Sequence, residues 1–354
     1  SWQPERAREC AALADCWKEL AGAGLVFWFE QGMAQEDAAV RRAWEAYRRR
    51  PDPEAVPARC LVTGEYGPIA RLHPAIKGVR DAQPSGASLV SYNAPALESY
   101  GKEQGQNAPV GEAAAFAYGA ALNALLADQR HVQLVGDATV VFWAQSAEVL
   151  YQDLFNAMAF GADDEAALSD GDLRDIAAHV ARGEAVRLEG VRIAPEEPFC
   201  VLGLSPNAAR LSVRFFLRNS FGNLLKNLDE HNRRLEIVRP AYERDAPLGV
   251  WRLLQETVNQ KSRDKKPAPL LAGAFLRAIL SGGDYPAALL QGVMLRIRAE
   301  QSVTYGRAAI LKAYWLKRNS HHKEVLTVAL NEETNCLPYV LGRMFSVLEA
   351  VQQA

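Results

Sequence analysis

The chain has 354 residues, of which 49% are apolar and 23% are charged. These proportions are ordinary for a globular protein, and the length allows two domains with a sizeable core. No run of 18 apolar residues occurs, so we expect no membrane span, and the net charge of −2 excludes a uniformly basic nucleic-acid binder.

The first sixty residues predict two helices and a strand. Apolar residues recur at helical spacing over 5–20 and again over 36–50, where Pro51 ends the second helix. The short apolar run at 25–29 is typical of a strand.

Residues 60–110 show little helical or strand periodicity, and Gly, Pro, Asn, Gln and Ser alternate there with short apolar anchors such as Ile69-Ala70. A long irregular segment is usually either disordered or functional. The anchors argue against disorder, and a Gly-permissive, amide-rich backbone suits close contact with a polar ligand. We therefore interpret this segment as a binding surface, with short strands at 60–63 and 88–92.

Helical and strand patterns alternate from residue 111 onward. The pattern predicts a helix at 111–127 and a hairpin of strands 132–135 and 138–143 that turns at Gly136-Asp137. Helical pieces follow in the acidic segment 151–198. A second hairpin is predicted at 200–204 and 210–217, turning through Ser205-Pro206-Asn207.

Beyond residue 217 the patterning is helical almost throughout. Candidate helices lie near 221–236, 248–260, 268–281, 286–300, 305–318 and 338–353. The sequence therefore predicts an α+β fold with a mixed N-terminal part of short strands, hairpins and long loops, followed by a mostly helical C-terminal part. We expect the domains to be 1–220 and 221–354.

The strand 210–218 alternates apolar and polar residues. Regular alternation would place its polar residues and one aromatic ring on one face, namely Arg210, Ser212, Arg214, Phe216 and Arg218. Successive arginines would then stand about 13 Å apart. That spacing suits a phosphate backbone, with Phe216 able to stack on a base. Alternatively, the arginines pair with carboxylates or with partner proteins on a solvated face.

Charge is distributed unevenly along the chain. Residues 199–354 hold 22 Lys and Arg against 13 Asp and Glu, whereas residues 1–198 hold 18 against 29. This asymmetry indicates one surface for polyanions and another kept away from them, although drift among solvent-facing residues explains it too. A basic run before Pro267 is suited to phosphate contact without sequence readout, or is a solvated connector: Lys261, Arg263, Lys265 and Lys266.

No motif in the sequence supports catalysis or a bound cofactor. The five scattered cysteines form no C-x-x-C pair, which is typical of reduced thiols in a cytoplasmic protein. Gly-rich phosphate loops and a nucleophile elbow are absent. Asp163-Asp164-Glu165 is a carboxylate cluster without a ligand partner at metal spacing, and His131 with Asp137 favours a structural hydrogen bond over an acid–base pair.

Several motifs resemble one family, the large subunit of the type I-C CRISPR surveillance complex (Cascade). They include Leu61-Val62-Thr63-Gly64-Glu65, Ile69-Ala70-Arg71-Leu72-His73-Pro74, Ser99-Tyr100-Gly101-Lys102-Glu103-Gln104-Gly105, Pro206-Asn207-Ala208-Ala209-Arg210, Arg296-Ile297-Arg298-Ala299 and Leu341-Gly342-Arg343. The similarity runs from about residue 60 to the end. Members of that family are longer at both ends, so we expect a trimmed chain.

The resemblance implies a non-catalytic subunit that recognises the protospacer-adjacent motif in duplex DNA, promotes strand separation and helps recruit a helicase–nuclease. The implied partners are double-stranded target DNA and its displaced strand, guide RNA, repeated backbone subunits, a guide-processing and capping subunit, small subunits and the helicase–nuclease. By resemblance, motif recognition falls to polar loop residues, namely Lys77, Gln83, Ser85, Ser88, Asn93, Lys102, Gln104 and Asn107.

Three alternatives stay open at the level of sequence. In the first, the loop amides serve only to hold the loop to itself. In the second, the protein is a metal-dependent nuclease or hydrolase with Asp163, Asp164 and Glu165 as ligands. In the third, it is a helical scaffold for other proteins that makes no contact with nucleic acid.

Overall fold

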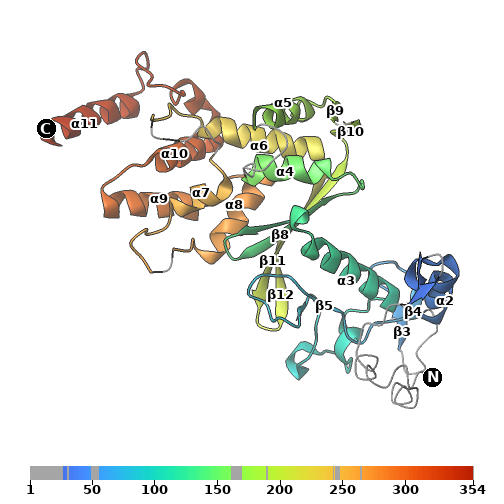
Figure 1. The fold of residues 1–354 in the computed structure, drawn as a ribbon. Coiled ribbons are helices and arrows are strands. Elements are labelled where there is room, and N and C mark those ends of the chain that lie inside the picture. Colours follow the sequence, from blue (N-terminus) through green and yellow to red (C-terminus); the bar gives the residue numbers. More distant parts are fainter. Residues whose placement is uncertain are drawn as a thin grey trace, which may run out of the picture. The chain divides into compact units, whose positions relative to one another are not determined.

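The computed structural model describes residues 27–29, 32–48, 56–160, 170–188, 190–241, 243, 248–263 and 265–353 (Figure 1). The chain divides into two compact units. Unit 1 comprises Ser1–Leu72 and Ala94–Ala115, and unit 2 comprises His73–Asn93 and Phe116–Ala354. The predicted domain boundary at residue 220 lies within unit 2, and the predicted helix at 5–20 lies outside the described residues.

Unit 1 is built from short elements joined by turns. The strands in its described part form two antiparallel pairs, β1 (Trp28–Phe29) with β2 (Gly32–Met33) and β3 (Pro57–Arg59) with β4 (Tyr66–Pro68). The helices among its described residues are α2 (Ala38–Arg48) and the 3-10 turns η2 (Ala34–Glu36), η3 (Pro95–Leu97) and η4 (Gln104–Asn107). The Asp37 carboxylate caps α2 by accepting the Ala39 and Val40 N–H groups at 2.8 and 2.9 Å. The apolar anchors Ile69 and Ala70 are buried, as the sequence predicts.

The predicted strand at 60–63 is wrong, because residues 61–63 form the turn between β3 and β4. Gly64, at φ +74°, donates its N–H to the Cys60 carbonyl at 2.9 Å and closes that turn. The predicted strand at 88–92 is reduced to β6 (Ala87–Ser88).

Unit 2 contains a six-stranded sheet in the order β5-β6-β12-β11-β8-β7. The strands are β5 (Ala75–Ile76), β6, β7 (Val132–Val135), β8 (Ala138–Ala144), β11 (Pro198–Asn207) and β12 (Arg210–Ser220). All neighbours are antiparallel except β6 and β12, which are parallel. The hairpin β7–β8 and the helix α3 (Glu112–Ala127) confirm the sequence prediction.

The second hairpin turns later than predicted. Pro206 pairs with Leu211 inside the ladder between β11 and β12, so the turn falls at Ala208 and Ala209. Ala208 takes φ +53° there. A further hairpin, β9 (Val186–Leu188) with β10 (Val191–Ile193), was not predicted within the acidic segment.

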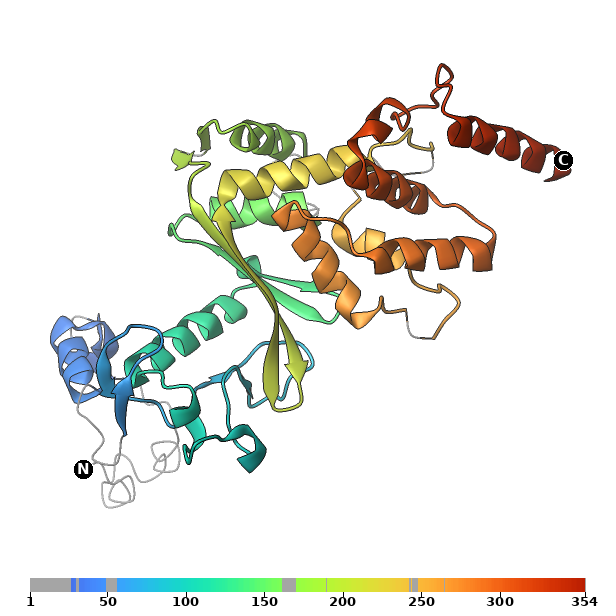
Figure 2. The same ribbon diagram turned by 180° about the vertical axis from the view of Figure 1, so that it is seen from behind.

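Helices gather on one face of the sheet of unit 2 (Figures 1 and 2). They are α4 (Leu150–Phe160), α5 (Asp170–Ala181), α6 (Phe221–Leu235), α7 (Val250–Gln255), α8 (Pro269–Ser281), α9 (Ala287–Glu300) and α10 (Tyr305–Arg318). Buried aromatic rings hold the first layer together, with centroids 4.9 Å apart for Phe155–Phe199 and 5.2 Å for Phe199–Phe221. A smaller core on the opposite face contains Ile76 and Leu204.

The helical C-terminal half follows the predicted periodicity closely. Helices α6, α8, α9, α10 and α11 (Leu337–Gln353) agree with the predicted ranges within one residue at each end. The predicted helix at 248–260 is instead the short α7, followed by turns in which the Thr257 hydroxyl donates to the Leu254 carbonyl at 2.7 Å.

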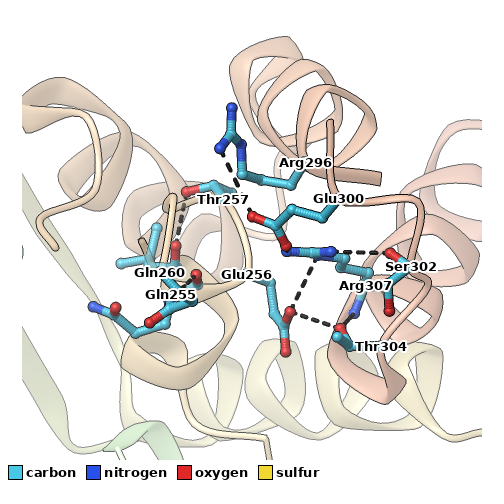
Figure 3. Close-up of polar contacts among 10 residues, drawn as sticks. Gln255, Glu256, Thr257, Gln260, Arg296, Glu300, Ser302, Thr304 and Arg307 are labelled. Atoms are coloured by element: carbon cyan, nitrogen blue, oxygen red, sulfur yellow. Dashed lines mark hydrogen bonds and ion pairs between the residues drawn. The ribbon is translucent and has the colours of Figure 1, made fainter. Parts of the chain in front are cut away.

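A buried ion-pair network ties α7, α9 and α10 together (Figure 3). The Arg307 side chain is 3% exposed, and its Nη2 donates to Glu300 Oε2 at 2.5 Å while its Nε lies 3.5 Å from Glu256 Oε2. The Thr304 hydroxyl donates to Glu256 Oε2 at 2.6 Å. A Cβ on Gly306 would stand 2.4 Å from Glu256 Oε1, so a side chain at this position would displace the Glu256 carboxylate from the network.

Candidate nucleic-acid interface

Three of the predicted site residues of unit 2 meet at the tip of the β11–β12 hairpin. Ser88 is paired with Arg210 across the parallel strands, and the Ser88 N–H donates to the Ala209 carbonyl at 3.0 Å. The Arg210 guanidinium donates to the Asn93 side-chain oxygen. We call Ser88, Asn93 and Arg210 the hairpin-tip cluster. Its hydrogen bonds fix a guanidinium and an amide side by side at the tip.

The other predicted residues of unit 2 present polar side chains near this sheet edge. Lys77 is exposed, and its backbone N–H donates to Asn123 Oδ1 at 2.7 Å. Gln83 and Ser85 lie in the turn that precedes β6, which the Gly86 N–H closes on the Gln83 carbonyl at 2.8 Å. Ser85 and Gln83 are both exposed. All three residues therefore have solvent-accessible surface that a ligand can meet.

In unit 1 the predicted residues bond to one another. Asn107 Oδ1 accepts the Ser99 N–H at 3.0 Å, and its Nδ2 donates to the Lys102 and Gln104 carbonyls at 3.0 and 3.1 Å. Gln104 Oε1 accepts from Arg71 at 2.8 Å. The Asn107 amide thus holds its own loop together, which is the structural alternative that the sequence leaves open, while the Lys102 side chain is exposed.

The predicted single face of β12 is wrong because the strand contains a β-bulge. Val213 pairs with Leu204 and Phe215 pairs with Gly203, which leaves Arg214 as an extra residue. One extra residue exchanges the two faces for all that follows. Arg210 is therefore on the opposite face from Phe216 and Arg218.

Arg214 is turned towards the helical side of the sheet. Its Nη2 donates to Asp137 Oδ2 at 2.8 Å, and both side chains are less than a third exposed. Arg214 also lines a groove of about 450 Å³ along α8, together with the exposed Arg277. Sequence reasoning missed Arg277, although its spacing from Ala274 and Ser281 places all three on the exposed side of α8.

Phe216 and Arg218 lie on the other face of the sheet, beside Trp143. Cys200 pairs with both Trp143 and Arg218, which puts the three in one row. The Trp143 and Phe216 rings stack at a centroid distance of 6.4 Å, and Phe216 is 54% exposed. We call Trp143, Phe216 and Arg218 the aromatic row. The missed residue, Trp143, is recognisable only once the strand register is known.

The predicted basic run lies in the loop between α7 and α8. Lys261, Arg263, Lys265 and Lys266 are all exposed, and none forms an ion pair with another described residue. Their charge is therefore not neutralised by the described part of this chain.

The described residues do not bring together the candidate catalytic or metal-binding groups. Asp163, Asp164 and Glu165 lie outside them, and the part of the chain that is described holds no group of three potential metal ligands. Asp137 pairs with Arg214 rather than His131, whose Nδ1 hydrogen-bonds to the Phe142 carbonyl at 2.9 Å. No helix among the described residues is long and apolar enough to cross a membrane.

Comparison with known protein families identifies the family to which the chain is similar. The family model described as CRISPR-associated protein (Cas_Csd1) matches residues 1–354, the whole of the chain. No curated protein sequence matches the chain significantly.

Proposed function

The chain belongs to the Cas_Csd1 family, and Csd1 is the large subunit of the type I-C Cascade complex; on this premise we propose that it recognises the duplex motif beside the target and promotes strand separation. In such a division of labour, guide pairing reads the target while the protein reads only a short flanking motif. The proposal includes recruitment of the helicase–nuclease by the assembled complex and no catalysis by this subunit.

The hairpin-tip cluster is the observation that supports the proposed motif recognition. Arg bidentate to guanine and Asn bidentate to adenine are the commonest readers of base edges. Arg210 and Asn93 present both chemistries side by side, held by hydrogen bonds to each other and through the pairing of Ser88. Lys77 supplies an exposed cation for a flanking phosphate.

Two further surfaces of unit 2 support contact with separated strands. The aromatic row combines stacked rings with a guanidinium, which is the chemistry that binds unpaired bases. The basic loop of Lys261, Arg263, Lys265 and Lys266 adds exposed charge suited to the phosphate backbone.

The experiment is a selection with the complete complex on target duplexes whose flanking base pairs are randomised. Asn93→Ala together with Arg210→Ala is expected to weaken binding to the preferred duplex about thirtyfold or more, because each of the two base contacts contributes about 1–3 kcal/mol. Motif enrichment should be lost as well. Arg187→Ala removes a similar exposed charge on β9 and is the matched control.

Unchanged enrichment by the double variant would remove the hairpin-tip cluster from motif recognition. If assembly survives and crosslinking to DNA and RNA is unchanged in variants of the cluster, the aromatic row and the basic loop together, the subunit is a protein scaffold instead.

The basic loop makes a separate prediction about salt. Replacing Lys261, Arg263, Lys265 and Lys266 with Gln should reduce the slope of log affinity against log salt by about 0.7–0.9 for each phosphate that the loop no longer neutralises. Motif preference should stay, because backbone contacts carry no sequence information. Binding titrations across salt concentrations measure the slope, with Arg187→Gln and Arg192→Gln on the β9–β10 hairpin as controls. An unaltered slope would show that the loop does not meet phosphate.

A further inference from the structure

A tight turn in unit 1 presents a tyrosine in a conformation that tyrosine disfavours. The Lys102 N–H donates to the Ser99 carbonyl at 3.0 Å, and the two central residues have φ +57° at Tyr100 and φ +67° at Gly101. Two positive φ values define a turn of the type that prefers Asn-Gly. Gly101 fits this preference, whereas Tyr100 does not.

Hydrogen bonds from the Asn107 side chain hold the two ends of this turn. Asn107 Oδ1 accepts from the Ser99 N–H, and Asn107 Nδ2 donates to the Lys102 carbonyl, each at 3.0 Å. Behind Asn107, a Cβ on Gly105 would stand 2.0 Å from the Ala70 carbonyl oxygen, so the backbone of the loop lies tightly against that segment. The turn therefore presents its central side chain from a rigid base.

The Tyr100 side chain contributes no packing that would justify its strained backbone. It is 98% exposed, and none of its contacts with the described chain is a hydrogen bond or a ring contact. Asn at this position would satisfy the turn and release the strain. Strained residues that the surrounding structure enforces are concentrated at binding and active sites. The strain and the exposure of Tyr100 together point to a ligand outside the chain.

Resting on the proposed function, we propose that Tyr100 stacks on a base of the target DNA where the duplex opens. An aromatic ring stacks on any base and needs no particular sequence, which suits strand separation rather than motif reading. Proteins that open or kink a duplex insert side chains of this kind between base steps. The exposed Lys102 is the last residue of the turn and supplies a cation for a phosphate next to that base.

The test uses the complete complex on target duplexes that carry 2-aminopurine at successive positions beside the motif. For the unaltered chain and for Tyr100→Phe, we expect one position to show quenching by the ring. Tyr100→Asn should abolish that quenching and slow strand opening roughly tenfold or more. The Asn variant should unfold at the same or a higher temperature than the unaltered chain, because it relieves the strained turn.

Asn107→Ala is the second variant, since it keeps the ring and removes its support. It should weaken the quenching at the same position while leaving Tyr100 in place. Equal quenching and opening rates for Tyr100→Asn and the unaltered chain would overturn the proposal. So would a stable Tyr100→Asn chain that fails to assemble, since the ring would then dock on a partner protein, or quenching that appears only with the probe in the guide RNA.

Failure of this proposal is distinguishable from failure of the proposed function. If Tyr100→Asn is without effect while the hairpin-tip variants lose motif enrichment, the recognition role stands and only the stacking role falls. If the hairpin-tip variants are also without effect, the recognition role falls with it.

Discussion

Arg307→Met is expected to lower the free energy of unfolding by about 3–5 kcal/mol, the cost of removing one partner from a buried ion pair. The Arg307 side chain is 3% exposed, and the Glu256 and Glu300 side chains facing it are 18% and 26% exposed. Without the guanidinium, Glu256 has no ion pair left among the described residues, and Glu300 keeps only Arg296 at 3.7 Å (Figure 3). Urea denaturation followed by tryptophan fluorescence measures the change.

The matched control is Arg298→Met, which removes an exposed arginine from α9, the helix that carries Glu300. It should change the free energy of unfolding by less than about 0.5 kcal/mol. Adding Glu256→Gln alone to Arg307→Met should recover part of the loss, because Glu300 keeps Arg296 as its partner at 3.7 Å and no carboxylate of the network is then left unpaired. If Arg307→Met and Arg298→Met have the same urea midpoint, the network does not hold the helices together.

The second large effect is a loss of stability in mild acid that depends on His231. This histidine of α6 is 3% exposed, and its Nδ1 hydrogen-bonds to the Tyr285 hydroxyl at 2.6 Å. Burial, with smaller contributions from the charges of Arg234 and Lys317, lowers the pKa of His231 from 6.5 to about 3. The folded protein therefore keeps this ring neutral at pH values where the unfolded chain protonates it.

The direction in which stability changes with pH follows from the lowered pKa of His231. The contribution of the neutral His231 ring to the free energy of unfolding is complete above pH 6.5. It is lost as the pH falls towards 3, at up to about 1.4 kcal/mol per pH unit. At pH 5 the loss is about 2 kcal/mol. Denaturation midpoints at several pH values should fall less steeply for His231→Gln than for the unaltered chain. His322→Gln, at a partly exposed position, is the control. Parallel pH profiles for the two variants would contradict this assignment.

Periodicity predicted most of the helical half because each helix has its own local pattern. Pro269 at the start of α8 and Pro286 just before α9 mark their beginnings, and Gly282 at φ +66° ends α8. The hairpin β7–β8 was equally readable from its Gly136-Asp137 turn. These features depend on neighbours within a few residues.

The features that the sequence did not predict depend on pairing between distant residues. The bulge at Arg214 exists only in the register of β12 against β11, so alternation along one strand cannot reveal it. The partners of Asn107 lie up to eight residues away and are backbone groups, which leave no trace in composition. The same holds for Trp143, whose place beside Phe216 follows from the order of the strands. The sequence identified each residue of the hairpin-tip cluster as a candidate, but it did not predict that the three lie side by side.

The bulge divides β12 into two segments whose side chains alternate with opposite phase, so that the face buried in one segment is the other face in the next. Before Arg214, the strand buries Leu211 against the smaller core; after it, the strand buries Phe215 against the larger one. Substitutions near the loop end of this ribbon and those near α6 therefore fall in different environments. The loop end of the ribbon can therefore be varied while the half that anchors the helices is left untouched.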